Sequence, residues 1–154
     1  MRHTDKKPVL HRICVIDGQG GGIGGAVIKK LRDVFGEAVE IIALGTNAIA
    51  TAQMLKAKAN RGASGENAIV QTSGKVDIII GPIGIIVANA MMGEVTPKMA
   101  EAVANSSAKK MLIPLTQENI EIIGLLPTPL PHLIETLLQE HLKNFYDEVN
   151  TDKL

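Results

Sequence analysis

A cluster of glycines near the N-terminus is the part of the sequence best suited to bind a ligand. Six glycines lie between Gly18 and Gly25, in the stretch DGQGGGIGG. Gly20, Gly22 and Gly25 match the spacing G-x-G-x-x-G. Glycines at this spacing permit a tight turn, let the backbone approach a pyrophosphate and allow a helix to pack closely on a strand. The pattern predicts a loop that binds an anion or a nucleotide through backbone amides.

The residues around the glycines predict a strand before them and a helix after them. Ile13 to Asp17 form an apolar run typical of a parallel strand that is buried on both faces. Four apolar residues then recur at helical spacing: Ile23, Val27, Leu31 and Val34. A helix that begins near Ile23 would direct its free amides and the positive end of its dipole at the anion. This context is the one that the glycine motif requires.

Short apolar runs and helical repeats alternate along the rest of the chain. Further strands are expected at residues 40–45, 76–81, 109–115 and 120–126, with a very short strand or loop at 59–62. Helices are expected at residues 48–59, 65–73, 82–93 and 96–106, before a long C-terminal helix that starts at His132. Residues 116–119 are too few for a helical crossover, so the last two strands should form an antiparallel hairpin at the sheet edge. This order predicts an α/β fold, a three-layer Rossmann-like sandwich with a mostly parallel sheet.

Length and composition limit the classes of protein to which this chain can belong. A chain of 154 residues favours one domain, expected at residues 12–149 with flexible termini at 1–11 and 150–154. Sixteen basic and sixteen acidic residues leave no net charge, and the only aromatic residues are two phenylalanines and one tyrosine, which argues against nucleic acid as a partner. The apolar stretch at residues 78–93 is too short to span a bilayer, and the charged N-terminus does not resemble a signal peptide. We therefore expect a cytoplasmic protein with no membrane partner.

Three loops should meet at one edge of the sheet, because parallel strands all end on the same side. The candidate binding residues of the first loop are Asp17, Gly18, Gln19, Gly20, Gly21, Gly22, Ile23 and Gly24. The second loop adds Thr46 and Asn47, either of which could cap the next helix, and the third adds Gly81, Pro82, Ile83 and Gly84. Open α/β sheets bind ligands in such a crevice.

The end of the second strand bears on which nucleotide would bind. A dinucleotide site usually has an acidic residue there, about 20 residues after the glycines, that holds the adenine ribose. This chain has Thr46 and Asn47 at that place, and Glu40 lies at the wrong end of the strand. The pattern favours the 2′-phosphate of NADP over NAD, or no dinucleotide at all. Arg61 is either a counter-charge for that phosphate or a solvated loop residue.

Asp17 lies beside the expected phosphate site and allows three interpretations. Its carboxylate caps amides of the loop, holds a magnesium ion, or takes part in catalysis. No residue set with metal-ligand spacing is present, because Cys14 is the single cysteine and the four histidines are scattered. A Walker A loop is excluded, since no Lys-Ser or Lys-Thr follows the glycines.

Residues able to catalyse a reaction are scarce. Gly18, Gly22 and Gly24 also match G-x-x-x-G-I-G, which resembles the cofactor loop of short-chain dehydrogenases. Those enzymes need a Tyr-x-x-x-Lys pair, and Tyr146 has no such lysine. His132 is read as a residue at the start of the last helix or as a general acid, and His141 as a packed core residue. Asn89 is either a buried polar anchor or a ligand contact. Whether the protein is an enzyme therefore stays open.

Five stretches together resemble an uncharacterised bacterial family of small single-domain proteins, a domain-of-unknown-function family. They are VIDGQGGGIG, ALGTNAIAT, ANRGASGENA, DIIIGPIGII and LPHLIE, and the resemblance runs from Arg12 to the last helix. It implies a bacterial cytoplasmic protein and transfers no activity.

The leading functional hypothesis is a protein that binds a nucleotide or dinucleotide, NADP-like first, through the loop from Gly18 to Gly24. The alternative is a non-enzymatic sensor or accessory subunit that binds a small phosphorylated or anionic metabolite. The apolar stretch at 84–93 and the expected edge hairpin further predict a homo-oligomer, because an apolar edge strand left in water promotes association.

Overall fold

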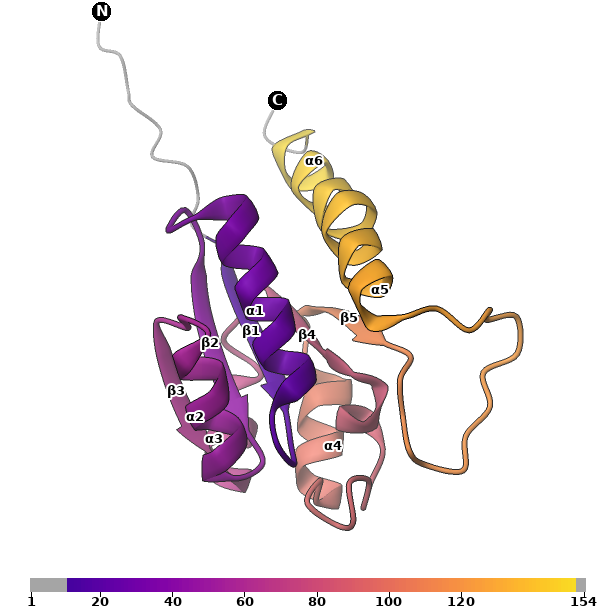
Figure 1. Ribbon diagram of the computed structural model, residues 1–154. Coiled ribbons are helices and arrows are strands. Elements are labelled where there is room, and N and C mark those ends of the chain that lie inside the picture. The colour runs from indigo at the N-terminus through magenta and orange to yellow at the C-terminus, as the bar shows by residue number, and fades with distance from the viewer. Residues whose placement is uncertain (1–10, 152–154) are drawn as a thin grey trace, which may run out of the picture.

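Five parallel strands form the centre of the protein in a computed structural model that describes residues 11–151 (Figure 1). The strands are β1 (Arg12–Asp17), β2 (Glu40–Gly45), β3 (Arg61–Ser64), β4 (Ile78–Pro82) and β5 (Lys109–Ile113), in the order β3-β2-β1-β4-β5. The expected α/β fold with a parallel sheet is confirmed. Of the flexible ends expected at residues 1–11 and 150–154, residues 1–10 and 152–154 lie outside the described residues.

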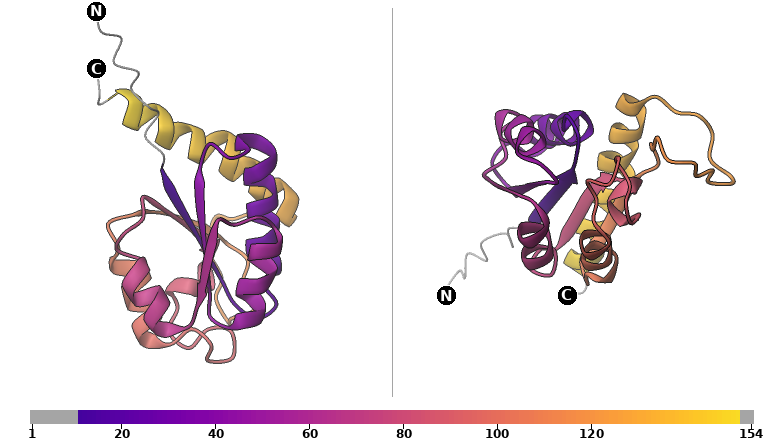
Figure 2. Two further views of the ribbon diagram at one scale, coloured as in Figure 1. Left: turned by 90° about the vertical axis from the view of Figure 1, so that its left-hand side faces the viewer. Right: turned by 90° about the horizontal axis from the view of Figure 1, so that it is seen from below.

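Helices cover both faces of the sheet, as the edge-on view in Figure 2 shows. On one face lie α1 (Gly22–Phe35), α2 (Ala48–Lys56) and a C-terminal helix made of α5 (Leu130–Thr136), the π-helix η2 (Leu137–Leu142) and α6 (Lys143–Thr151). On the other face lie α3 (Glu66–Thr72) and α4 (Pro97–Asn105). The core is almost entirely aliphatic, as expected for central strands whose residues are buried on both faces.

Local cap signals in the sequence coincide with helix ends. The Asn47 side chain accepts a hydrogen bond of 2.8 Å from the Ala50 amide at the start of α2. The Thr96 hydroxyl likewise accepts one from Met99 at the start of α4, where Pro97 takes the first helical position. In α1 the predicted stripe is buried at Val27 and Leu31, but Val34 is exposed.

The predicted antiparallel hairpin is wrong, because residues 120–126 form no strand. Residues 114–129, here named the connecting segment, leave β5 and project from the body of the protein before α5 begins (Figures 1 and 2). Pro114 directly follows β5 and has no amide for a strand ladder. Gly124 adopts φ 93°, which interrupts the apolar run. The backbone therefore turns where the side-chain pattern resembles a strand.

The helix predicted at residues 82–93 is also wrong. Only a short 3-10 helix, η1 (Ile83–Ile86), follows β4. The chain then makes a compact turn at residues 87–95, here named the Glu94 turn, in which Asn89, Met91 and Met92 have positive φ. Ile85 and Ala90 are buried in the core beneath this turn. The apolar residues of this stretch are therefore buried one by one, without the regular spacing of a helix face.

Two histidines differ from their expected surroundings. His11, expected in the flexible N-terminus, is buried, and its ring lies 5.6 Å from that of Phe145 and 4.9 Å from that of Tyr146 between centroids. His141, expected in the core, is exposed, whereas the neighbouring Leu142 is fully buried. A π-helical turn holds more residues than an α-helical turn. The buried face of the C-terminal helix therefore shifts by about one position within η2, from His141 to Leu142.

Candidate functional site

A pocket of about 590 Å³ opens beside the carboxyl ends of β1 and β4. The strand order reverses between these two strands, and open α/β sheets bind ligands at that point. The pocket is lined by Asp17, Gln19, Ile23, Pro82, Gly84, Asn89, Met91, Met92, Gly93, Leu115, Thr116, Gln117 and Glu118. Its walls thus come from the glycine loop (residues 18–24) with Asp17 before it, the loop after β4, the Glu94 turn and the connecting segment.

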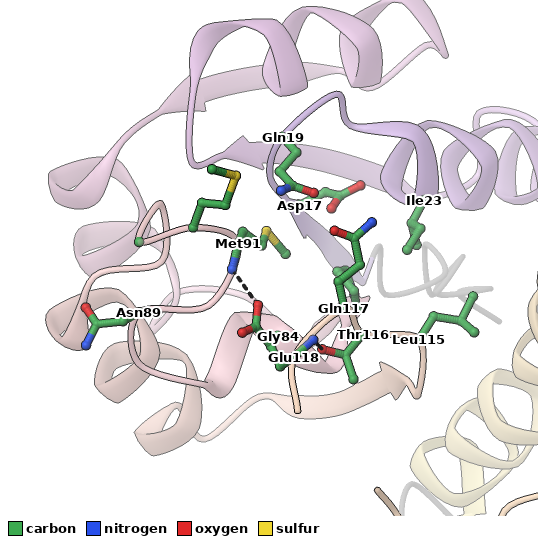
Figure 3. A pocket seen from close by; sticks show the side chains of 13 residues that line it. Asp17, Gln19, Ile23, Gly84, Asn89, Met91, Leu115, Thr116, Gln117 and Glu118 are labelled. Atoms are coloured by element: carbon green, nitrogen blue, oxygen red, sulfur yellow. Dashed lines mark hydrogen bonds between the residues drawn. The ribbon is translucent and has the colours of Figure 1, made fainter. Parts of the chain in front are cut away.

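Figure 3 shows how these walls face one another. Asp17 and Gln19 lie opposite Gln117 of the connecting segment. The Glu118 carboxylate accepts a hydrogen bond of 2.8 Å from the Met91 amide, which joins the connecting segment to the Glu94 turn (Figure 3). Sequence reasoning assigned no site residue to the connecting segment, because it treated these positions as a hairpin.

Asp17 caps the glycine loop through its side-chain carboxylate. The residue is 4% exposed, and its carboxylate accepts hydrogen bonds of 2.7 Å from the amides of both Gly18 and Gly24. Burial raises the pKa of the Asp17 carboxyl above its ordinary value. The loop amides oppose this rise, and the nearby Glu94 carboxylate adds to it. Of the three interpretations open from the sequence, the geometry supports the cap.

The glycines of the loop serve different purposes. Gly21 has φ 73°, and a Cβ there would lie 2.8 Å from the Ala50 backbone. A Cβ on Gly24 would lie 2.6 Å from the Met54 sulfur, which shows how tightly α1 packs beside α2. Gly20 and Gly22 differ, because a Cβ at either would meet nothing within 4 Å. These two positions leave the backbone at the start of α1 open to a ligand.

The remaining predicted residues divide between the pocket and its surroundings. Gly18 lies beneath the side chains of Met91 and Thr46, and Gly81 packs against the Ile16 carbonyl. Thr46 and Asn47 lie beside the glycine loop, where the Asn47 side-chain amide donates to the Gln19 backbone carbonyl at 3.0 Å. Ile83 faces away and lines a groove between β5 and the C-terminal helix.

Glu94 is a further residue beside the glycine loop that sequence reasoning missed. Its Oε1 accepts three hydrogen bonds: 2.9 Å from the Gln19 amide, 2.7 Å from the Thr46 hydroxyl and 2.6 Å from the Asn47 side chain. Partial desolvation alone would raise the pKa of Glu94, but these three donors hold it below its ordinary value. No sequence spacing links Glu94 to the end of β2, since the Glu94 turn brings it there through tertiary structure.

Arg61 does not reach this site. It begins β3 and so lies at the amino edge of the sheet, opposite the pocket. Its guanidinium pairs with Glu40 at 2.6 Å. The proposed role as a counter-charge for a 2′-phosphate is therefore wrong, because the interpretation from sequence took β3 for a possible loop.

Two features are absent from the part of the chain that the structure describes. No group of three or more His, Cys, Asp and Glu side chains there is placed to hold a metal ion. No helix within it is both long and apolar enough to cross a bilayer.

Comparisons with known proteins place the chain in a family. A solved structure titled "Crystal structure of universal stress protein in complex with cAMP" is 16% identical, with a TM-score of 0.40, over 68% of this chain and 97% of that one. No curated protein sequence matches the chain. The resemblance drawn from the five sequence stretches is confirmed by a family model that matches residues 12–146. This match covers most of the sequence, and the chain therefore belongs to the family described as Domain of unknown function (DUF3842).

Proposed function

We propose that the protein binds a nucleotide, with a phosphate on the open amides of the glycine loop and the rest of the ligand in the pocket between β1 and β4. The observation that carries this proposal is the open backbone at Gly20 and Gly22, where α1 begins beside the pocket. Within the described residues, neither amide donates a hydrogen bond. Free amides at a helix N-terminus favour an anion through hydrogen bonds and the helix dipole.

The pocket has a size and lining suited to the remainder of such a ligand. A volume of about 590 Å³ falls within the range of roughly 300–1,000 Å³ common for small-molecule sites. Ile23, Met91 and Leu115 supply apolar surface, while Gln19 and Gln117 supply amide groups. This mixture fits a base and a sugar better than it fits inorganic phosphate alone.

Asp17 limits how much negative charge the site accepts. Because it already accepts from Gly18 and Gly24, a phosphate shares the start of α1 with a carboxylate. A magnesium ion that accompanies the nucleotide would reduce the repulsion between the two. We therefore propose that magnesium strengthens binding of a nucleotide that carries several phosphates.

Thermal unfolding with a panel of ligands tests the proposal. The panel comprises NADPH, NADH, FMN, ATP and inorganic phosphate, each with and without magnesium. A nucleotide present at about 100 times its dissociation constant should stabilise the fold by roughly 2.7 kcal/mol, because it binds only the native state. A shift with phosphate that equals the shift with every nucleotide favours the anionic-metabolite sensor instead. No shift with any ligand contradicts nucleotide binding.

We also propose that the protein forms a homo-oligomer, on grounds that differ from the sequence-based ones. The apolar helix and the edge hairpin that suggested it do not exist in the structure. The support is now the position of β5 at one end of the sheet and the exposure of Met92, Ile123 and Leu126, which are 83–96% exposed. Light scattering at high protein concentration should give a mass above 16.4 kDa, and a monomer mass would contradict the proposal.

A further inference from the structure

The structure supplies the acidic residue whose absence from the end of β2 favoured NADP. We propose that Glu94 determines the specificity of the glycine-loop site: it accepts a hydrogen bond from a free ribose hydroxyl and rejects a 2′-phosphate. The inference rests on the nucleotide binding proposed above and reverses the preference for NADP drawn from the sequence.

The position of Glu94 is the first support. Thr46 directly follows β2, and its amide donates to the Asp17 carbonyl at 3.0 Å, which places it beside the glycine loop. Glu94 hydrogen-bonds to Thr46 and to the Gln19 amide. Its carboxylate therefore lies between the end of β2 and the glycine loop, where dinucleotide-binding folds place the acidic residue that holds the adenine ribose. The residue comes from a turn after β4 instead of from β2.

The hydrogen bonds of Glu94 leave one acceptor available. All three donors, from Gln19, Thr46 and Asn47, bind Oε1. Among residues 11–149, whose side chains are described, none hydrogen-bonds to Oε2. Oε1 thus fixes the orientation of the half-buried carboxylate, and Oε2 is the atom that would accept from a ribose hydroxyl.

The Glu94 turn is itself held in place from both sides. The Asn89 amide donates to the Val95 carbonyl at 2.7 Å, and the Met91 amide donates to Glu118 at 2.8 Å. Asn89, Met91 and Met92 adopt positive φ, an unfavourable conformation that the surrounding contacts must maintain. Glu94 is therefore pre-oriented before a ligand arrives.

Charge explains why a 2′-phosphate would be refused. The donors to Glu94 favour its ionised form, so the site presents a negative charge where the 2′-phosphate would lie. The described residues that line the pocket include Asp17 and Glu118 but neither lysine nor arginine. Arg61, the one counter-charge that the sequence suggested, is paired with Glu40 at the other edge of the sheet. A second phosphate at this place would meet carboxylates without a compensating cation.

Two ligands that differ only in the 2′-phosphate test the inference. Calorimetric titration of the full-length protein with 5′-AMP and with adenosine 2′,5′-diphosphate should show at least tenfold tighter binding of 5′-AMP, or about 1.4 kcal/mol. The Glu94→Gln variant keeps the side-chain shape and loses the charge, so the two affinities should come within about threefold of each other. Glu101→Gln is the matched control, because it removes the same charge from an exposed position on α4. It should leave the tenfold ratio unchanged.

The possible outcomes separate this inference from the proposed function. Equal affinities in the wild-type protein, or tighter binding of the 2′,5′-diphosphate, overturn the role of Glu94, and that measurement needs no variant. An unchanged ratio in Glu94→Gln overturns it as well, while binding of 5′-AMP itself would still support the proposed function. If the wild-type protein binds neither ligand, the proposed function fails and this inference fails with it.

Discussion

Replacing Gly81 by alanine should destabilise the fold by about 3 kcal/mol, a large effect for a single added methyl group. A Cβ at position 81 would overlap the Ile16 carbonyl oxygen and lie 2.9 Å from the Ile85 side chain. Both neighbours are about 1% exposed, and Ile16 belongs to the central strand β1, so the backbone has little freedom to move away. Overpacking of this kind costs about 1–3 kcal/mol and occasionally more. The measurement is the urea concentration at the midpoint of unfolding, with the slope of the transition as a check on two-state behaviour.

Gly74→Ala is the matched control for this substitution. A Cβ at Gly74 would meet nothing within 4 Å, and the residue lies in an exposed turn after α3. The free energy of unfolding should therefore change by less than about 0.5 kcal/mol. A midpoint for Gly81→Ala equal to that of Gly74→Ala would contradict the close approach of β1 and β4 that defines this edge of the pocket.

Where a sequence signal is local, it located the corresponding structure well. The second strand was predicted at residues 40–45, which are the bounds of β2. Asn47 and Thr96 cap the helices that follow them, because a short polar side chain before a helical repeat satisfies an amide in the first turn. The alternation of strands and helices was enough to predict the parallel sheet, since consecutive parallel strands require a helical crossover between them.

Predictions based on apolar runs failed where glycine, proline or tertiary packing decides the backbone. Residues 120–126 have the composition of a strand, but Pro114 and Gly124 break the path that would pair them with β5. The run at 82–93 resembles a buried helix, but it folds into η1 and the Glu94 turn around buried Ile85 and Ala90. Periodicity does not distinguish a short apolar run that is helical from one that is merely buried.

In the candidate site, too, the residues that follow a local sequence signal were predictable and those placed by tertiary packing were not. The glycine loop and Asp17 follow β1 directly, so their place at the carboxyl end of the sheet was predictable from the chain order. Glu94 lies 77 positions after Asp17, on a turn with three non-glycine residues of positive φ, and nothing in its own sequence neighbourhood indicates a contact with Gln19. Sequence reasoning found no acidic residue at the end of β2 and therefore favoured an NADP-like ligand, whereas the preference that we propose rests on Glu94.

The second large effect is expected on binding, from Gly22→Asp. A Cβ at Gly22 would meet nothing within 4 Å, and an acidic residue in the first turn of α1 interacts favourably with the helix dipole, so the protein should remain folded. The new carboxylate would lie at the amides proposed to hold the phosphate. Two unit charges about 4 Å apart repel by roughly 4 kcal/mol near a protein surface, which is more than the 2.7 kcal/mol of a hundredfold change. Binding of 5′-AMP should therefore weaken at least a hundredfold.

Gly22→Ala separates the effect of charge from that of a side chain. The added methyl group enters open space and improves the helix propensity of the first turn, so binding should change by less than about threefold. Circular dichroism of both variants should match that of the wild-type protein, because neither substitution contacts the core.

Titration of 5′-AMP into the wild-type protein, Gly22→Ala and Gly22→Asp, followed by calorimetry, tests the central claim most directly. The account predicts saturable binding to the first two proteins and at least a hundredfold weaker binding to the folded third. Equal affinity for all three, or binding to none of them, would contradict a nucleotide site on the amides of the glycine loop.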